Sequence, residues 1–146
     1  GRRAVVGRRS EGGGREDGRR LSSLRAAQKS LGLGPGAVII KTGEYGSARC
    51  CKSDHLLSQY YFAPAYTLEK INDPTGAGDT FAGGFMGYLA GAGQKSDAAL
   101  RRAMVYGSVL GSFAVEKFGL WRLLSLKQAE IHARARHFAK LTQFQL

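Results

Sequence analysis

Gly76, Gly78 and Asp79 are the residues whose types and spacing point most directly to chemistry. Two glycines one residue apart let the backbone turn tightly and let a bulky group approach its N–H groups. If a helix begins there, its unpaired N–H groups and the positive end of its dipole can bind phosphate. A carboxylate beside that phosphate can accept the proton of an attacking hydroxyl group. The spacing equally allows a structural role, in which Asp79 only caps the helix.

The flanking residues predict the elements that hold this turn in place. Pro74 fixes its own φ and biases Asp73 toward an extended conformation, so an extended segment should lead into the turn. The following residues carry no charge until Lys95 and repeat with helical spacing. One face of the expected helix carries the aromatic residues Phe81, Phe85 and Tyr88, and the opposite face carries the small residues Gly83, Gly87 and Ala90. We therefore expect this helix to be packed on both sides.

The contiguous sequence Asp-Pro-Thr-Gly-Ala-Gly-Asp-Thr-Phe, residues 73–81, resembles the C-terminal signature of the ribokinase-like (PfkB-type) carbohydrate and nucleoside kinases. The small-residue helix that follows is also similar to that of the family. The resemblance implies that Asp79 is the catalytic base. It implies that the γ-phosphate of ATP is held in an anion hole by the backbone amides of Gly76, Ala77 and Gly78. It further implies that Asp73 and Thr75 help to hold a monovalent cation.

A second segment resembles the part of the family that lies beside the nucleotide. Residues 37–42 form a β-branched run that is typical of a buried strand, and a glycine-containing turn follows at residues 43–46. The family has a comparable strand and turn next to its nucleotide site. The resemblance therefore implies that Thr42 and Gly43 line that site. An ordinary hairpin turn explains both residues as well.

A long helix is predicted from Asp97 to about Lys117, because apolar residues recur there at helical spacing. Glycine inside a helix costs about 1 kcal/mol relative to Ala, so it suggests that something packs closely. In the family this helix borders the adenine pocket, and the resemblance implies that the lining residues are Gly107, Ser108 and Gly111. Simple contact between two helices explains them equally well. The resemblance also places residues 113–119 at the cation site, through backbone carbonyl groups.

The remaining elements are read from periodicity and turn residues. Helical spacing predicts a helix at residues 21–31, and short extended runs predict strands at residues 47–52, 59–63 and 67–71. Ser125 and Gln128 have the spacing of a capping box, so a last helix should begin there and continue almost to the C-terminus. The three histidines have no metal-binding spacing, and we expect them to be structural or surface residues.

Composition fits a globular protein with an unusual N-terminal segment. The chain has 146 residues, 43% hydrophobic residues and a formal net charge of +11. Nine Lys or Arg against three Asp or Glu fall in residues 1–30, so much of the charge is concentrated there. Residues 1–20 show neither helical nor strand periodicity and are predicted to be disordered. A basic arm that binds nucleic acid is the alternative, but no aromatic residue lies among the arginines to stack on bases.

Several other classes of protein are disfavoured by the sequence. Cys50 and Cys51 are adjacent and have no further cysteine to pair with, which fits a reducing, cytoplasmic setting. No apolar run approaches the roughly 20 residues of a membrane-spanning helix, so no membrane association is expected. The Walker loop, the Rossmann fingerprint and the protein-kinase motifs are missing. The chain starts with neither Met nor a secretory pattern, so we expect a fragment or a processed chain.

Together these observations predict an α/β fold: the C-terminal part of a ribokinase-like three-layer α/β/α sandwich at residues 21–146, preceded by a disordered Gly/Arg-rich tail at residues 1–20. The expected activity is phosphorylation of a hydroxymethyl group on a sugar or nucleoside, with ATP, Mg²⁺ and, as in many members, K⁺. The family's acceptor-binding half is not recognisable here. We therefore expect weak nucleotide binding, little turnover and a tendency to self-associate. The alternatives are a non-catalytic nucleic-acid-binding module and a kinase-derived remnant.

Overall fold

The computed structural model describes residues 4–8, 25–52, 60–93 and 96–143. The chain divides into two compact units, Gly1–Pro64 and Ala65–Leu146. The predicted boundary at residue 20 lies outside the described residues, as does His55. None of the helices within the described residues is both long enough and apolar enough to cross a membrane.

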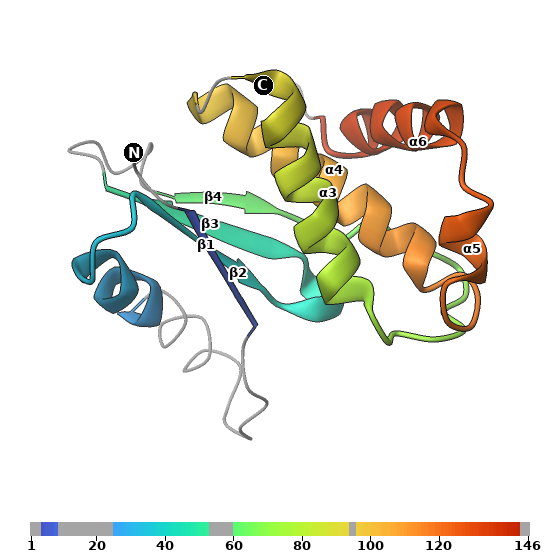
Figure 1. Cartoon of the computed structure of the whole chain (residues 1–146), viewed down its shortest axis with the longest axis horizontal. Helices are drawn as coiled ribbons and strands as arrows, with labels where there is room; N and C mark the ends of the chain where they lie inside the picture. The colour runs from blue at the N-terminus through green and yellow to red at the C-terminus, as the bar shows by residue number, and fades with distance from the viewer. Residues whose placement is uncertain (1–3, 9–24, 53–59, 94–95, 144–146) are drawn as a thin grey trace. The chain divides into compact units, whose positions relative to one another are not determined.

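The N-terminal unit contains a four-stranded sheet in the order β1-β2-β3-β4 (Figure 1). Its strands are Ala4–Arg8 (β1), Ala37–Lys41 (β2), Ser47–Cys51 (β3) and Tyr60–Ala63 (β4). The first two strands run parallel, and the other neighbours run antiparallel. The β-branched residues of β2 favour this extended conformation, and the short 3-10 turn Gly43–Tyr45 (η1) joins β2 to β3. The strands predicted at residues 37–42, 47–52 and 59–63 are thereby confirmed.

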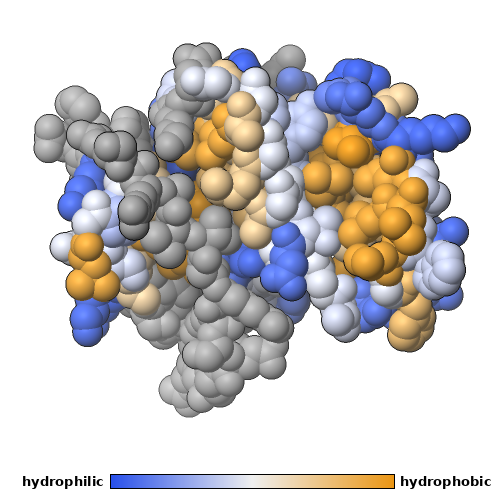
Figure 2. Space-filling model, in the orientation of Figure 1, coloured by the Kyte–Doolittle hydropathy of each residue, from blue (hydrophilic) through white to orange (hydrophobic). Residues whose placement is uncertain are grey.

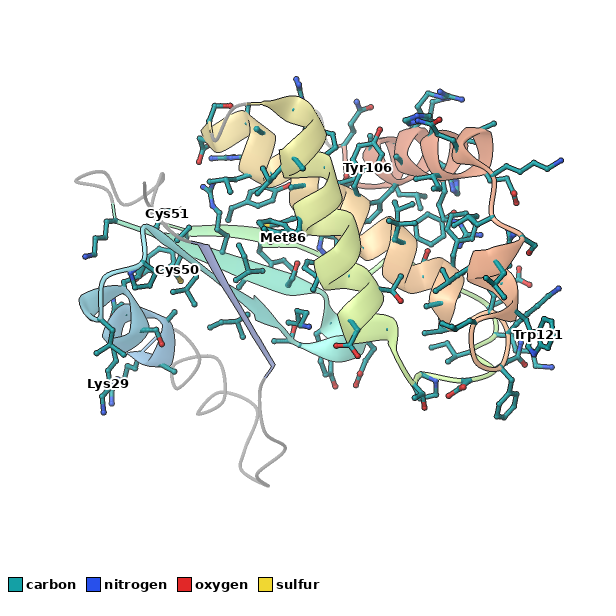
Figure 3. The ribbon with its side chains drawn as sticks, in the orientation of Figure 1. Lys29, Cys50, Cys51, Met86, Tyr106 and Trp121 are labelled. Atoms are coloured by element: carbon teal, nitrogen blue, oxygen red, sulfur yellow. The ribbon has the colours of Figure 1, made fainter. Side chains whose placement is uncertain are left out.

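A small apolar core holds this unit together. The helix at residues 25–32 contributes Ala27 and Leu31, which form one buried cluster with Val38 of β2 and Cys50 of β3. Figure 3 shows Cys50 and Cys51 side by side on the sheet. Their side chains point to opposite faces because they are consecutive residues of one strand. Burial, with a smaller contribution from Cys51, raises the pKa of the Cys50 thiol to about 11, so this cysteine behaves as a core residue.

Two sequence predictions are wrong, one in each unit. Residues 4–8, inside the segment predicted to be disordered, form strand β1 and pair with β2 from Ala4↔Ala37 to Arg8↔Lys41. The apolar run Ala-Val-Val is too short to show a strand periodicity in the sequence. It can nevertheless form a strand by pairing with a strand that is distant in the sequence. Conversely, the predicted strand at residues 67–71 is irregular. A short extended run does not suffice for a strand when no neighbouring strand pairs with it.

The C-terminal unit is helical (Figure 1). Its helices are Ala77–Ala92 (α3), Asp97–Ala114 (α4), Trp121–Leu124 (α5) and Gln128–Leu141 (α6). Helix α3 begins inside the glycine cluster as predicted and is followed by Gly93, which has a left-handed conformation. The Ser96 hydroxyl caps α4 by accepting the amide of Ala99 at 3.2 Å. Buried side chains of α4 and α6 form the core of this unit: Val109, Phe113, Ala135 and Phe138.

The C-terminal helix boundaries differ from the prediction in two places. Helix α4 ends at Ala114 rather than near residue 117, since the following residues turn back toward the start of α3. Helix α6 is capped at Lys127 rather than Ser125, because the Glu130 carboxylate accepts the Lys127 amide at 3.0 Å. The Ser125 hydroxyl instead donates to the carbonyl groups of Trp121 and Arg122, the first two residues of α5.

Candidate active site

The start of α3 is built around a glycine in a conformation that other residues rarely adopt. Gly76 has φ 78° and ψ −6°, and it stands directly before the first residue of the helix. Its carbonyl group accepts the amide and the hydroxyl of Thr80, each at 2.9 Å. The Ala77 amide donates to the Pro74 carbonyl group at 3.3 Å, which is long for a hydrogen bond. The turn therefore presents the N-terminus of a 16-residue helix to its surroundings.

Asp79 lies in the first turn of α3, and its side chain is exposed. It lines an open groove of about 510 Å³ together with Thr80, Gly83, Gly84, Leu110, Leu123, Leu126 and Ile131. Apart from Asp79 and Thr80 these lining residues are apolar or glycine, and Figure 2 shows a hydrophobic area over the helices of this unit. Within the described ranges the Asp79 carboxylate makes neither a hydrogen bond nor an ion pair. The carboxylate is thus available to a molecule that enters the groove.

Asp73 has very different surroundings. One carboxylate oxygen accepts the Thr75 amide at 2.9 Å, and the other accepts the Gly119 amide at 3.3 Å. Hydrogen bonds from Thr75, and then from the Gly119 backbone, hold the pKa of Asp73 below its ordinary value of 3.8. The sequence placed both Asp73 and Thr75 at a cation site, and the structure brings them together in one turn.

The segment after α4 is joined to the residues just before the glycine turn. The Val115 carbonyl group accepts the amides of Asn72 and Asp73, at 2.9 and 3.3 Å. The side-chain amide of Asn72 donates to the Glu116 carbonyl group at 2.5 Å. Carbonyl and carboxylate oxygens are the donor atoms that hard cations prefer, and a cation site in this neighbourhood stays a prediction. In the described part of the chain no group of three His, Cys, Asp or Glu side chains forms a metal site.

Two of the predicted nucleotide-lining residues lie against α3. A Cβ atom on Gly107 would come within 2.9 Å of the Phe81 carbonyl oxygen and 3.0 Å of the Phe81 ring. A Cβ atom on Gly111 would lie 3.2 Å from the carbonyl oxygen of Ala77. Ser108 between them is half-buried. The helix–helix alternative thus accounts for both glycines, and a role in lining the nucleotide site stays a prediction.

Thr42 and Gly43 lie at the tip of the β2–β3 hairpin. The Thr42 amide and hydroxyl both bond to the Gly46 carbonyl oxygen, at 2.8 and 2.9 Å, and Gly43 has φ 64°. These residues belong to the N-terminal unit, whereas the loop from Asp73 to Thr80 belongs to the C-terminal unit. The second group forms one site within the C-terminal unit, and the role of Thr42 and Gly43 in lining the nucleotide site stays a prediction.

Sequence reasoning did not identify four residues that support this loop: Asn72, Glu116, Arg122 and Arg134. Arg122 and Arg134 both pair with the Glu116 carboxylate, and Asn72 bonds to the Glu116 backbone. Asn72 and Glu116 are 44 positions apart, so no local pattern connects them. One sequence prediction did concern part of this network, because residues 113–119, which include Glu116, were expected to lie beside the cation site.

Comparison with known proteins identifies the family. The pfkB family carbohydrate kinase model matches residues 14–124, which is most of the chain and includes part of the predicted tail. The chain therefore belongs to the pfkB family of carbohydrate kinases. It is similar to the 5-dehydro-2-deoxygluconokinase of Photobacterium profundum, with 35% identity over 71 residues, 49% of this chain and 20% of that protein.

The fold is the mixed α/β fold of the ribokinase-family kinases. An aminoimidazole riboside kinase from Salmonella enterica, solved with aminoimidazole riboside and an ATP analog, matches with TM-score 0.67 and 23% identity, over 90% of this chain and 41% of that one. A double mutant of fructokinase from Vibrio cholerae O395, in a form with fructose, ADP and potassium ion bound, matches with TM-score 0.65 and 23% identity, over 77% of this chain and 34% of that one. The chain thus spans a fifth of the curated relative and about two fifths of the first structure.

Proposed function

We propose that this chain carries the phosphoryl-transfer centre of an ATP-dependent kinase whose acceptor is a hydroxymethyl group of a sugar or nucleoside. The observation that carries the proposal is the position of Asp79. It is an exposed carboxylate in the first turn of a long helix that follows a left-handed glycine, and it lines a groove. Membership of the carbohydrate kinase family supports the same reaction class.

Asp79 would act as the general base. Its carboxylate would accept the proton of the acceptor hydroxyl group as that oxygen attacks the γ-phosphorus of ATP. The amides of Gly76, Ala77 and Gly78 would stabilise the negative charge on the transferring phosphoryl group, aided by the dipole of α3. The long bond from the Ala77 amide to Pro74 costs little to exchange for a bond to phosphate.

The remaining site residues would bind and orient rather than react. Mg²⁺, when bound with the nucleotide, neutralises charge on the phosphate oxygens. The oxygen atoms of Asp73, Thr75 and the turn after α4 would hold a K⁺ ion, as the potassium form of the fructokinase relative supports. We assign nucleotide contacts to Thr42, Gly43, Gly107, Ser108 and Gly111.

Replacing the base tests the proposal. Because little turnover is expected of this chain, phosphoryl transfer from radiolabelled ATP is measured at high enzyme concentration against a panel of hexoses, pentoses and nucleosides. We expect Asp79→Asn to lower the rate by about 10²–10⁴-fold, the usual contribution of a general base, while MgADP affinity and helix content stay near wild type. Asp97→Asn is the matched control, because Asp97 is also an acid in the first turn of a helix.

Two results would contradict the proposal. Equal rates for Asp79→Asn and wild type would show that another group accepts the proton. Failure of the wild-type chain to bind MgADP would refute the assignment of the phosphate site itself.

A further inference from the structure

The Glu116 carboxylate lies between two arginines. Arg122 Nε donates to one oxygen at 2.8 Å, and Arg134 Nη2 donates to the other. The side chains are only 24%, 16% and 17% exposed for Glu116, Arg122 and Arg134. Both carboxylate oxygens are therefore occupied in a place largely shielded from water, where ion pairs are stronger than at an open surface.

Each arginine is itself fixed by further contacts. Arg122 also pairs with Glu130 at 2.5 Å, and Arg134 also donates to the Ser112 hydroxyl at 2.9 Å. Both guanidinium groups lie over the ring of Phe113, with Cζ at 4.8 Å for Arg122 and 3.4 Å for Arg134. Hydrogen bonds to Glu130 and Glu116 raise the pKa of Arg122, so its charge is permanent. The position of Glu116 is thus set by residues of α4, α5 and α6.

The backbone at Glu116 is the part that contacts the candidate active site. Its carbonyl group and that of Val115 accept three bonds from Asn72 and Asp73. A fourth bond runs from the Gly119 amide to the Asp73 carboxylate. All four bonds join residues 115–119 to the two residues that lead into the glycine turn.

We propose that Glu116, Arg122 and Arg134 are positioning residues for the loop from Asp73 to Asp79. Their ion pairs fix the turn after α4, and this turn holds Asn72 and Asp73 so that the loop is ordered before nucleotide binds. The inference rests on the proposed function of that loop. A loop that is already ordered loses no further conformational freedom when nucleotide binds. The network therefore contributes to nucleotide affinity without touching the nucleotide.

The positioning role is tested by amide hydrogen exchange in the chain without nucleotide. In Glu116→Ala we expect the amides of Asn72, Asp73 and Gly119 to exchange about tenfold faster. The reason is that residues 115–119, which hold the hydrogen bonds of these amides in place, are no longer fixed by the ion pairs of Glu116. Glu116→Gln keeps the size of the side chain and one acceptor oxygen, so it should give an intermediate effect and serves if the alanine variant does not fold. Val109→Ala is the control, because Val109 is fully buried in the α4–α6 core and its substitution leaves the side chains of Glu116, Arg122 and Arg134 unchanged.

Two exchange results would overturn the proposal. Wild-type exchange at all three amides in Glu116→Ala would mean that the ion pairs do not order the loop. Faster exchange in step with every other amide of the unit, as in Val109→Ala, would mean that the network only stabilises the fold.

A double variant and a nucleotide titration complete the test. If Arg134 acts through Glu116, adding Arg134→Ala to Glu116→Ala should not accelerate exchange at Asn72 and Asp73 further, whereas additive effects would contradict the coupling.

Calorimetry should show MgADP binding about tenfold more weakly to Glu116→Ala than to wild type, with Asp97→Asn unchanged. Equal affinity in the two would overturn the link to nucleotide. Absence of MgADP binding to wild type would instead refute the proposed function, while the exchange comparison, which needs no nucleotide, still decides the ordering of the loop.

Discussion

Asp73 and Asp79 belong to one short loop, yet their carboxylates have opposite surroundings. Backbone amides occupy both oxygens of Asp73, and these bonds lower its pKa. Asp79 is exposed in the groove and has no such bonds among the described residues. A carboxylate with two fixed partners is suited to holding a turn, whereas one without partners is suited to receiving a proton. The structure thus gives Asp73 a fixed place in the turn, and a chemical role for Asp79 stays a proposal.

Gly76 should be the residue of the loop that tolerates a side chain least. A Cβ atom there would meet nothing within 4 Å, so the cost of Gly76→Ala comes only from its φ of 78°. We expect Gly76→Ala to lower the free energy of unfolding by about 1–2 kcal/mol, measured by urea denaturation. Gly76→Asn should lose less, since asparagine tolerates the left-handed region. Equal stability of Gly76→Ala and wild type would mean that the loop adopts another conformation in solution.

At the scale of elements, both faces of α3 were expected to be packed against other elements, and this expectation is wrong for one face. The sequence predicted close packing on the face of Gly83 and Gly87, but both are exposed with nothing within 4 Å of a Cβ atom. Close packing occurs at Gly84, where a Cβ atom would lie 2.7 Å from Leu110 and 3.0 Å from the Tyr106 carbonyl oxygen. A helical pattern identifies which residues share a face, but it does not reveal which face a distant helix covers.

The packing of α4 on α3 gives a matched pair of substitutions. Gly107→Ala should destabilise the chain by about 1–3 kcal/mol, because its methyl group would press on the Phe81 backbone, which cannot move aside easily. Gly87→Ala adds the same methyl group at an exposed helical position and should stabilise by up to about 1 kcal/mol. Thermal unfolding of both variants measures the difference. Similar melting temperatures would contradict the close contact of the two helices.

Local chemistry determined which elements could be predicted from the sequence. The glycine turn and the β-branched strand β2 each depend on neighbouring residues, and both are found where expected. Strand β1 and the irregular segment at residues 67–71 depend on whether a distant strand is available, and both were predicted wrongly. The same limit applies to the site: its candidate catalytic residues form a contiguous motif, but the Glu116 network joins segments that no local pattern links.

At the scale of the whole molecule, the C-terminal unit leaves large apolar side chains in contact with solvent. Phe118, Leu120, Trp121 and Leu124 are 72%, 65%, 73% and 76% exposed, all within residues 118–124. Figure 3 shows Trp121 pointing away from its helix. Soluble monomers seldom expose so many large apolar residues close together in the sequence, and such surfaces promote association.

We therefore expect the chain to self-associate as its concentration rises, which sedimentation velocity can measure. Trp121 is the only tryptophan in the sequence, so its fluorescence reports on this segment alone. At low concentration the emission should be that of an exposed indole and strongly quenched by acrylamide, and association through this segment should shift it to shorter wavelength.

Leu120→Ser with Leu124→Ser should weaken association, because it removes apolar area without touching the core. Serine substitution at Leu33, an equally exposed leucine in the N-terminal unit, is the control. Association that persists in the double variant with unchanged Trp121 emission would show that copies of the chain meet through a different surface.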